Sequence, residues 1–574
     1  MDPNTLTSPV TDARRPQTQT TPGGVLSPPN DDPTWWRRAV IYQVYLRSFA
    51  DGNGDGTGDI AGLRLRLGYL AELGVDAIWI TPWYMSPLAD GGYDVSDYRA
   101  INPEFGTIDE AQELIREALD LGIRTIIDIV PNHLSDAHPW FQAALAAGPG
   151  SPERERFWFV ESEEIPTHWI SPFGGRTWTR TTNADGTPGE WYLHLFTAEQ
   201  PDVNWNHQDV RAEYESVLRF WFDRGVAGVR IDSAALLVKD PALPEVPEHP
   251  EAGGHPWQDR DALHDIYESW RAIADDYPGT RALVGELWLP DVSRFIRYLR
   301  PSELHTAFNF DFMSRPWTEP QIRESIASTL AAHEPIGAPA TWVLSNHDVT
   351  RPVTRLGRQD TSFAFGKKQF NTPTDVEKGA RRARAAALLT AALPGSLYIY
   401  QGDELGLPEV ENIPRNKLND PMHYQSGGTD PGRDGCRVPL PWEPEGSSYG
   451  FGPDGATEPW LPQPHGWSSL SVASQEHDPD SMLTLYRRAI RLRADDPDVR
   501  GADFAWADLG PGVLAFTRGT HFMCLTNFTA QHVPLPSGTT VVLASEELVN
   551  RELAPDATAW LRRTTDAVEN TTQR

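Results

Sequence analysis

The chain has 574 residues, and its 50 Lys and Arg against 80 Asp and Glu leave a net charge of −30 at pH 7. This length exceeds that of one small module and predicts about three or four domains, or one large barrel with appendages. With 39% hydrophobic and 23% charged residues the chain can bury a core. Its acidic balance argues against nucleic-acid and anionic-membrane partners, because phosphate binding needs clustered positive charge.

The first 34 residues contain seven Pro and seven Thr and no apolar segment, which predicts a disordered tail over residues 1–34 rather than a signal peptide or an anchor. Nowhere do 18 apolar residues follow one another, so we expect no transmembrane segment and no membrane partner. The only cysteines, Cys436 and Cys524, allow at most one disulfide, and a reducing compartment is the simpler interpretation. We therefore expect a cytoplasmic protein.

Short β-rich runs alternate with helical segments along most of the chain, a pattern typical of parallel strands joined by crossover helices. The runs predict eight strands, at residues 41–45, 77–80, 124–130, 228–231, 282–285, 306–310, 341–344 and 397–400. Between them the sequence predicts helices at residues 60–73, 109–121, 210–222, 261–275 and 376–392. Eight such repeats predict an α/β fold, a (β/α)8 TIM barrel.

The barrel must carry long insertions, because such barrels typically need ~250 residues. We assign residues 35–131 and 206–497 to the catalytic barrel and the Trp-rich segment 132–205 to an inserted small domain after the third strand. Residues 408–466 are rich in Gly, Pro and Asp, and we expect them to shape the mouth of an active site. Alternating runs near the end predict a C-terminal antiparallel β-sandwich domain at 498–574.

Barrel enzymes carry their reactive groups at the carboxyl ends of the strands. Any one acidic residue there is more often a helix cap or a solvated loop residue. Here, however, several strand ends supply charged or polar groups at once: Asp128, Asn132, His133, Arg230, Asp232, Glu286, Asn346, His347 and Asp348. Carboxylates crowded into one cleft have their pKa values pushed apart, and an ionised and a protonated carboxyl are what glycosidic bond cleavage requires.

Aromatic residues favour the same hypothesis. The chain contains 21 Trp, 16 Tyr and 21 Phe, and sugar rings present apolar C–H faces that pack against aromatic planes. Most of these Trp residues are nevertheless expected in the core.

Four ordered motifs resemble the signature regions of the α-amylase family, glycoside hydrolase family 13. They are Asp-Ile-Val-Pro-Asn-His at 128–133, Gly-Val-Arg-Ile-Asp at 228–232, Gly-Glu at 285–286 and Ser-Asn-His-Asp at 345–348. Two further segments, Gly-Tyr-Asp-Val-Ser-Asp-Tyr at 92–98 and Gln-Pro-Asp-Val-Asn at 200–204, are similar to the α-glucosidase and oligo-1,6-glucosidase branch. The resemblance extends from about residue 35 to residue 467.

The resemblance implies a role for each carboxylate. Asp232 would be the nucleophile that forms a glucosyl-enzyme ester, Glu286 the general acid/base, and Asp348 the carboxylate that binds sugar hydroxyls and stabilises the transition state. The product would keep the α configuration. Arg230 lies two residues before Asp232, therefore on the same face of a strand, and can hold that carboxylate ionised.

The resemblance also implies substrate-binding residues. His133 and His347 would bind hydroxyls of the sugar at the cleavage point. Asp90 and Arg437 would form an ion pair behind the terminal glucose, and Tyr93 would stack on its ring. Phe196 and Gln200, from the inserted domain, would contact the substrate as well.

The loop at 51–59 places oxygen-bearing side chains at alternating positions, which suits Ca²⁺ or Mg²⁺. It is not an EF-hand, because Gly62 stands where an EF-hand needs a bidentate Glu. In the family branch that the chain resembles, a similar loop binds one structural ion. That resemblance implies the ligands Asp51, Asn53, Asp55, Thr57 through its carbonyl, and Asp59. A metal-free loop of Asx turns is the alternative.

Together these features predict a retaining, exo-acting α-glucosidase that acts on maltose and short oligosaccharides, as a monomer or homodimer. Ser233, directly after the predicted nucleophile, favours α-1,4 links, because relatives that cleave α-1,6 bonds resemble one another in carrying Val there. The alternatives are a transglucosylase or sucrose-cleaving enzyme of the same family and, more remotely, a non-catalytic binding or chaperone subunit. The retained acids argue against the last.

Overall fold

The computed structural model describes residues 19–20, 26–27, 32–183 and 185–564. Most of the predicted tail at 1–34 lies outside the described residues. Of the predicted tail, the structure describes two short strands, β1 (Gln19–Thr20) and β2 (Leu26–Ser27), which pair antiparallel. None of the helices in the described part of the chain combines the length and hydrophobicity needed to span a bilayer.

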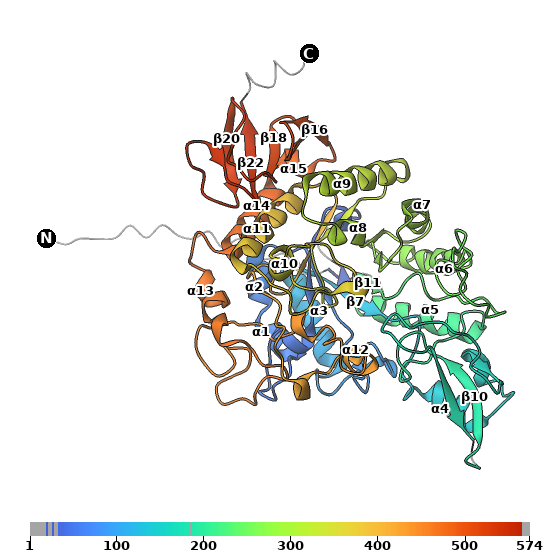
Figure 1. Ribbon diagram of the computed structural model, residues 1–574. Helices are drawn as coiled ribbons and strands as arrows, with labels where there is room; N and C mark the ends of the chain where they lie inside the picture. The colour runs from blue at the N-terminus through green and yellow to red at the C-terminus, as the bar shows by residue number, and fades with distance from the viewer. Residues whose placement is uncertain (1–18, 21–25, 28–31, 184, 565–574) are drawn as a thin grey trace.

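A nearly closed parallel barrel of eight strands forms the centre of the molecule (Figure 1). In chain order the strands are β3 (Val40–Val44), β4 (Ala77–Ile80), β7 (Arg124–Ile129), β11 (Gly228–Ile231), β12 (Ala282–Gly285), β13 (Thr306–Ala307), β14 (Thr341–Val343) and β15 (Ser396–Tyr400). Consecutive barrel strands pair except β13 and β14, and β15 returns to pair with β3. At the seam between β13 and β14 the hydroxyls of Thr306 and Thr341 hydrogen-bond. The predicted fold class is confirmed.

The sixth strand is shorter than predicted. It ends at Ala307 because Asn309 caps a short helix, α8 (Phe310–Ser314), by accepting a hydrogen bond from the Phe312 amide at 3.0 Å. The side chain of Asn309 thus accepts a hydrogen bond from a backbone amide of the helix, which favours a helix over continuation of the strand.

Helices cover the barrel where the sequence predicts them: α3 (Ile108–Asp120), α5 (Gln208–Asp223), α6 (Leu263–Asp275) and α11 (Val376–Ala392). The predicted helix at 60–73 is interrupted at Arg66, which separates α1 (Ile60–Leu65) from α2 (Leu67–Leu73) and stacks its guanidinium 4.4 Å from the ring of Trp442. One long helix, α9 (Glu319–His333), was not predicted. Its buried side chains mix apolar with polar residues (Ile322, Ser325, Ile326, Thr329 and His333), so its hydrophobic pattern is weak.

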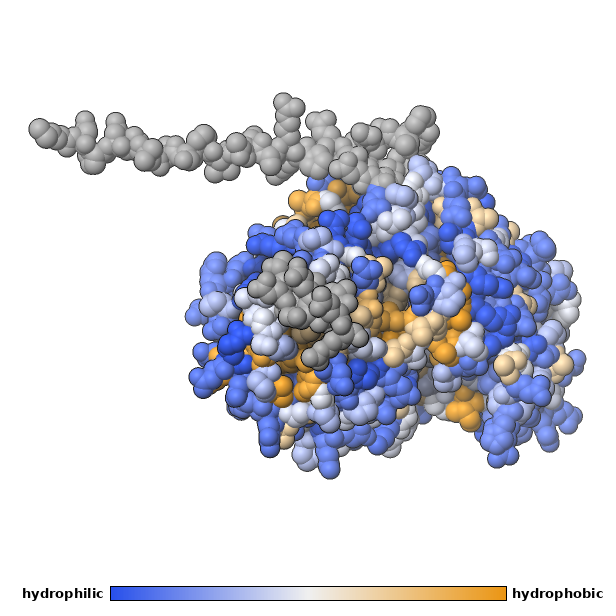
Figure 2. Space-filling view, turned by 90° about the horizontal axis from the view of Figure 1, so that it is seen from above, coloured by the Kyte–Doolittle hydropathy of each residue, from blue (hydrophilic) through white to orange (hydrophobic). Residues whose placement is uncertain are grey.

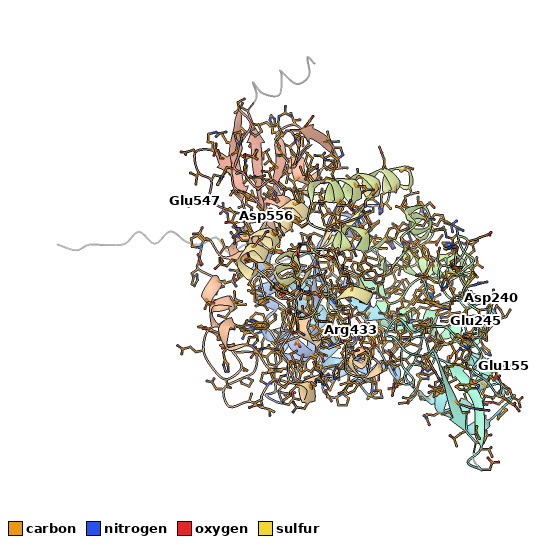
Figure 3. All side chains as sticks on the ribbon, viewed as in Figure 1. Glu155, Asp240, Glu245, Arg433, Glu547 and Asp556 are labelled. Carbon is orange, nitrogen blue, oxygen red and sulfur yellow. The ribbon has the colours of Figure 1, made fainter. Side chains whose placement is uncertain are left out.

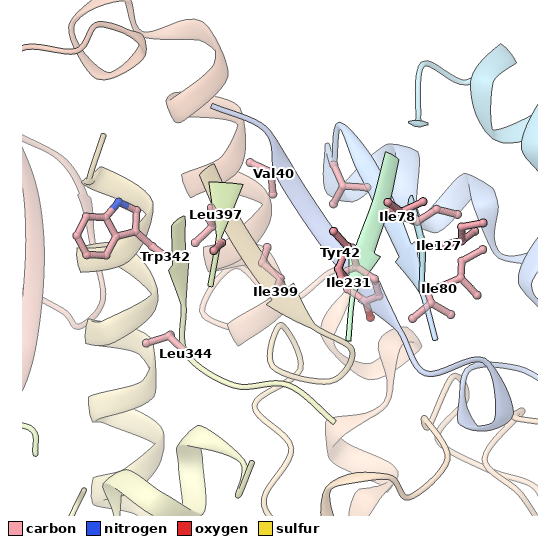
Figure 4. Packing of buried hydrophobic residues seen from close by; sticks show 14 of the residues in the cluster. Val40, Tyr42, Ile78, Ile80, Ile127, Ile231, Trp342, Leu344, Leu397 and Ile399 are labelled. Atoms are coloured by element: carbon pink, nitrogen blue, oxygen red, sulfur yellow. The ribbon is translucent and has the colours of Figure 1, made fainter. Parts of the chain in front are cut away.

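The strands bury apolar side chains toward the helices. Figure 4 shows this packing at Val40, Tyr42, Ile78, Ile80, Ile127, Ile231, Trp342, Leu344, Leu397 and Ile399. Alternate residues of each strand point into the barrel, as strand geometry dictates. Because the eight strands are parallel, the polar residues that follow them lie at one end of the barrel.

The segment at 132–205 forms a small sheet of its own in the order β8-β10-β9, from β8 (Phe159–Val160), β9 (Trp178–Thr182) and β10 (Pro188–Leu193). It projects from the barrel at the end opposite the C-terminal sheet (Figure 1). Trp158, Trp169 and Trp178 are buried in its core. These Trp residues are structural, as expected for most of the Trp residues in the chain.

The C-terminal part is an antiparallel five-stranded sheet in the order β16-β17-β18-β22-β20. Its strands are β16 (Ala505–Asp508), β17 (Val513–Arg518), β18 (Phe522–Asn527), β20 (Thr539–Ala544) and β22 (Ala557–Arg563). One face packs on α11, where the Trp560 indole donates a hydrogen bond to the Leu388 carbonyl at 3.0 Å. From above, where this sheet lies, the surface is mostly hydrophilic, with hydrophobic residues gathered in a hollow (Figure 2).

Candidate active site

A cavity of about 220 Å³ lies where the loops after the barrel strands meet. Its walls contain all three predicted catalytic acids: Asp232 after β11, Glu286 after β12 and Asp348 beyond β14. The other lining residues are Asp90, Tyr93, His133, Pro172, Phe173, Phe196, Ser233, Ala235, Leu236, Trp257, Gln258, Trp288, His347, Phe365 and Arg433. Acids separated by more than a hundred positions in the sequence therefore converge on one cavity.

Arg230 organises the carboxylates. It is fully buried on β11, in register with Asp128 on the neighbouring β7. One terminal nitrogen donates to Asp128 at 2.7 Å and to Asp232 at 2.8 Å, and the other lies 2.6 Å from Oε2 of Glu286. Because one guanidinium contacts both Asp232 and Glu286, these two carboxylates are held close together.

A second link joins the two strand ends. The backbone N–H of Ser233 donates to Oε2 of Glu286 at 3.0 Å, and the N–H of Ala234 donates to the Glu286 carbonyl at 3.0 Å. Ser233 takes a left-handed backbone conformation, with φ of 48°. This turn aims its N–H across to the neighbouring strand end, so the predicted nucleophile and acid/base are fixed to each other through backbone as well as side chain.

Burial and neighbouring charges act in opposite directions on Asp232. Burial raises the pKa of Asp232 well above its usual range; Arg230 opposes this shift, and the nearby Glu286 carboxylate adds to it. Arg230 is the nearby cation that favours the ionised form of Asp232.

Asp348 has the opposite tendency. Burial alone would raise its pKa, but His347, Arg433 and Arg437 lower it below its usual range. Since burial also lowers the pKa of His347 and keeps that ring neutral, the two arginines carry the charge that holds Asp348 ionised. They donate to Asp348 Oδ1 at 3.0 Å and 2.9 Å.

The ion pair expected between Asp90 and Arg437 is formed by a different arginine. Arg433 donates to Asp90 at 2.6 Å, while Arg437 donates to Asp348 and to the His347 carbonyl at 2.8 Å. The turn η8 (Asp434–Cys436) separates the two arginines. It places Arg433 in the cavity wall and leaves Arg437 behind it (Figure 3 labels Arg433).

Four other predicted substrate residues line the cavity: Tyr93, His133, Phe196 and His347. The Tyr93 and His347 rings are stacked, with centroids 5.3 Å apart, and burial lowers the pKa of His133 to about 4, so its ring is neutral. Gln200 is buried behind the wall, where its amide donates to Asp90 at 3.2 Å. In this arrangement Gln200 supports a cavity residue rather than lining the cavity.

Several lining residues were not predicted. Trp257, Trp288 and Phe173 lie in irregular loops, and Phe365 opens the short 3-10 helix η6 (Phe365–Lys367). Nothing local there distinguishes an aromatic residue of a site from one of the core. Arg433 differs, because it opens the segment 433–437 from which Arg437 was chosen. The presence of a second arginine four residues before Arg437 was the signal in the sequence that could have indicated Arg433.

In the predicted metal loop, side-chain oxygens accept hydrogen bonds from the loop's own backbone amides. The Asp51 carboxylate accepts the amides of Gly54 and Gly56 at 2.6 Å and 2.9 Å, and the other side-chain oxygens accept loop amides in the same way. Among the described residues, no three His, Cys, Asp or Glu side chains are arranged to hold a metal ion. The carboxylates of the predicted ligand set do not converge on one point here. Binding of a divalent ion stays a prediction.

Both cysteines are buried free thiols. Neither lines the cavity. They contribute packing, and no disulfide joins Cys436, in the loop after β15, to Cys524 on β18.

Comparison with known proteins agrees with this geometry. The model of the α-amylase catalytic domain matches residues 43–501. A probable α-glucosidase of Rhizobium meliloti is 35% identical over 542 residues, covering 89% of this chain and 91% of that protein. An oligo-1,6-glucosidase of Parageobacillus thermoglucosidasius is 32% identical over 539 residues, covering 86% and 90%.

A solved structure is similar to this chain over nearly its whole length. The crystal structure of the α-glucosyl transfer enzyme XgtA has a TM-score of 0.78 and 32% identity, covering 92% of this chain and 99% of that one. The match therefore includes the regions outside the barrel. The chain belongs to the α-amylase family.

Proposed function

We propose that the protein is a retaining, exo-acting α-glucosidase that releases terminal α-linked glucose from maltose and short oligosaccharides. The observation that carries this proposal is the shared guanidinium: Arg230 contacts both Asp232 and Glu286 at the wall of one cavity. Retaining enzymes need such a close pair, with carboxyls ~5–5.5 Å apart, because no water fits between nucleophile and substrate. The named relatives above are consistent with it.

In the first step the Asp232 carboxylate attacks the anomeric carbon of the terminal glucose. The bond to the glycosidic oxygen breaks with its electron pair on that oxygen, and Glu286 gives the oxygen its proton. The products are a β-glucosyl ester on Asp232, an ionised Glu286 and the shortened sugar. Asp348, held ionised by two arginines, binds sugar hydroxyls and opposes the positive charge that develops on the ring.

In the second step Glu286 acts as a base. It takes a proton from a water molecule whose oxygen attacks the anomeric carbon, and the ester electrons return to Asp232. Each step inverts the anomeric carbon, so glucose leaves with the α configuration. Arg230 stabilises whichever carboxylate is ionised, and the proton returns to Glu286 for the next cycle.

The buried ion pair between Asp90 and Arg433 supports exo action. It is part of the cavity wall, beside the stacked rings of Tyr93 and His347. A wall of paired charges can bind the hydroxyls of a terminal sugar but leaves no route for a chain to continue. The identity of Ser233, whose hydroxyl-bearing side chain lines the cavity, supports a preference for α-1,4 links.

Replacement of the nucleophile tests this proposal. Asp232→Ala should abolish the cleavage of p-nitrophenyl α-glucoside, because no ester can form. Activity at a tenth of the wild-type value would refute the assignment. Circular dichroism and a melting curve should show that the variant still folds, since the other acids and Arg230 remain in place.

Transfer of glucose to another sugar is the second candidate function. It is favoured by the apolar wall of Phe173, Trp257 and Phe365, which can bind a sugar acceptor and exclude water, and by the similarity to a glucosyl transfer enzyme. Chromatography of the products from maltose, sucrose and isomaltose separates the two. Monosaccharides alone (glucose, with fructose from sucrose) indicate hydrolysis, and longer or isomerised sugars indicate transfer.

A further inference from the structure

Trp288 contacts the predicted acid/base directly. It follows Glu286 by two positions, and its indole N–H donates to Oε1 of that residue at 3.1 Å. The indole stacks on Phe310 with ring centroids 3.9 Å apart and meets the edge of Phe365 at 4.8 Å. Trp288 and Phe365 both line the catalytic cavity. Aromatic contacts on two sides therefore fix the direction of the N–H.

The two oxygens of Glu286 have different surroundings. Oε2 accepts the Ser233 amide at 3.0 Å and lies 2.6 Å from the Arg230 guanidinium. Among the described residues, Oε1 accepts a hydrogen bond only from the neutral indole of Trp288. A proton on Oε2 would face a cation and an N–H donor, neither of which can accept a hydrogen bond. The proton of Glu286 therefore resides on Oε1, where a lone pair is still available to the indole.

We propose that Trp288 is a positioning residue for proton transfer: its N–H fixes the orientation of the Glu286 carboxyl so that Oε1 presents the proton to the leaving oxygen. This inference rests on the proposed function. The glycosidic oxygen takes the proton from Oε1 as its bond to the anomeric carbon breaks, and Glu286 is left ionised. The indole N–H then stabilises the new carboxylate until water returns a proton.

Two charged groups lie close to Glu286: Arg230 on β11 and Asp232 directly after it. Asp348, from the loop after β14, lines the same cavity. None of them changes in a variant at position 288, so a change in the pH profile of such a variant reports the lost N–H. Because an N–H donor favours the ionised form of a carboxyl, its removal moves the loss of the catalytic proton to higher pH.

The experiment compares two substrates in Trp288→Phe. Maltose has a poor leaving group that needs the proton, whereas 2,4-dinitrophenyl α-glucoside has a leaving group that does not. We expect kcat/KM to fall about tenfold for maltose, the effect of losing one hydrogen bond to a charged group, and to change little for the activated substrate. The alkaline limb of the maltose profile should shift to higher pH.

Trp257→Phe is the matched control. Trp257 lines the same cavity, but its indole nitrogen has no hydrogen-bond partner among the described residues. Because no hydrogen bond to Glu286 is lost there, the same substitution should leave the alkaline limb of the maltose profile in place. Incorporation of benzothienylalanine at position 288 keeps the shape of the ring without the N–H, and it should reproduce Trp288→Phe if that variant folds poorly.

The proposal would be overturned if, in both position-288 variants, kcat/KM fell equally for the two substrates and the alkaline limb stayed in place. Trp288 would then only line the cavity. Failure of the proposed function has a different signature. A wild-type protein that does not cleave maltose, or an active Asp232→Ala variant, would refute the α-glucosidase assignment whatever Trp288 does.

Discussion

Arg433, which was not predicted, connects three carboxylates in and around the site. Its guanidinium contacts Asp90 at 2.6 Å, Asp348 at 3.0 Å and Asp420 at 2.6 Å, and it stacks over the ring of Phe173 at 4.6 Å. All three carboxylates are largely buried. One planar group with several donors can satisfy three largely buried acids at once.

We therefore expect Arg433→Ala to destabilise the protein and weaken substrate binding together. Removing one partner of a buried ion pair costs about 3–5 kcal/mol, and the midpoint of thermal unfolding should fall by several degrees. KM for maltose should rise, because Asp90 loses its partner in the cavity wall. Arg433→Lys should restore little, since one ammonium cannot span three carboxylates. A lysine variant with wild-type KM and melting temperature would contradict this account.

The strands and the metal loop show what sequence patterns can predict at the level of an element. Strands β3, β4, β7, β11 and β12 begin and end within one residue of the predicted runs, because a buried parallel strand needs an unbroken apolar run bounded by turns. Ends set by a capping side chain, such as Asn309 before α8, depend on one hydrogen bond and are less visible.

Metal binding at the loop 51–59 is tested by chelation. If the loop binds Ca²⁺, saturating Ca²⁺ should raise the melting temperature over that in EDTA, with a stabilisation of ~2.7 kcal/mol at a hundred times the dissociation constant. Asp55 is exposed in the loop, and Asp55→Ala should abolish the difference. Asp109→Ala, at an exposed acid outside the loop, should preserve it. Identical curves with Ca²⁺ and EDTA would favour the metal-free loop.

At the scale of the whole molecule, the C-terminal sheet completes the core of the barrel. Trp560 on β22 is fully buried against α11, and Thr558 donates to the Ala385 carbonyl at 2.9 Å. Nearby, Arg382 of α11 binds Asp556 at 2.9 Å (Figure 3 labels Asp556). Without the sheet, a helix that contributes to the barrel would expose an apolar face.

Trp560→Ala should consequently destabilise the whole chain, and not the C-terminal sheet alone. Replacing a buried Trp by Ala costs about 3–5 kcal/mol, and we expect catalytic activity and the sheet to be lost in one thermal transition at a lower temperature. Trp506, 36% exposed on β16, is the control, and Trp506→Ala should change the midpoint little. Separate transitions for activity and sheet would show that the two regions unfold independently.

The sequence predicts the position of the site better than its walls. Asp232, Glu286 and Asp348 follow buried strands, and barrel topology requires such residues to converge. Choosing between Arg433 and Arg437 depends on a turn in a long irregular loop, and Trp288 pairs with Phe365 only through contacts between distant loops. Packing of this kind leaves no periodic trace in the chain.

The paired charges of Asp90 and Arg433 in the cavity wall have a consequence for how a population of oligosaccharides would be consumed. On the proposed function, freed glucose occupies the blind end and the trimmed remainder lies toward the solvent, so both must depart before another molecule enters. Degradation is then distributive: every chain in the mixture shortens gradually in parallel, and intermediates of all lengths accumulate.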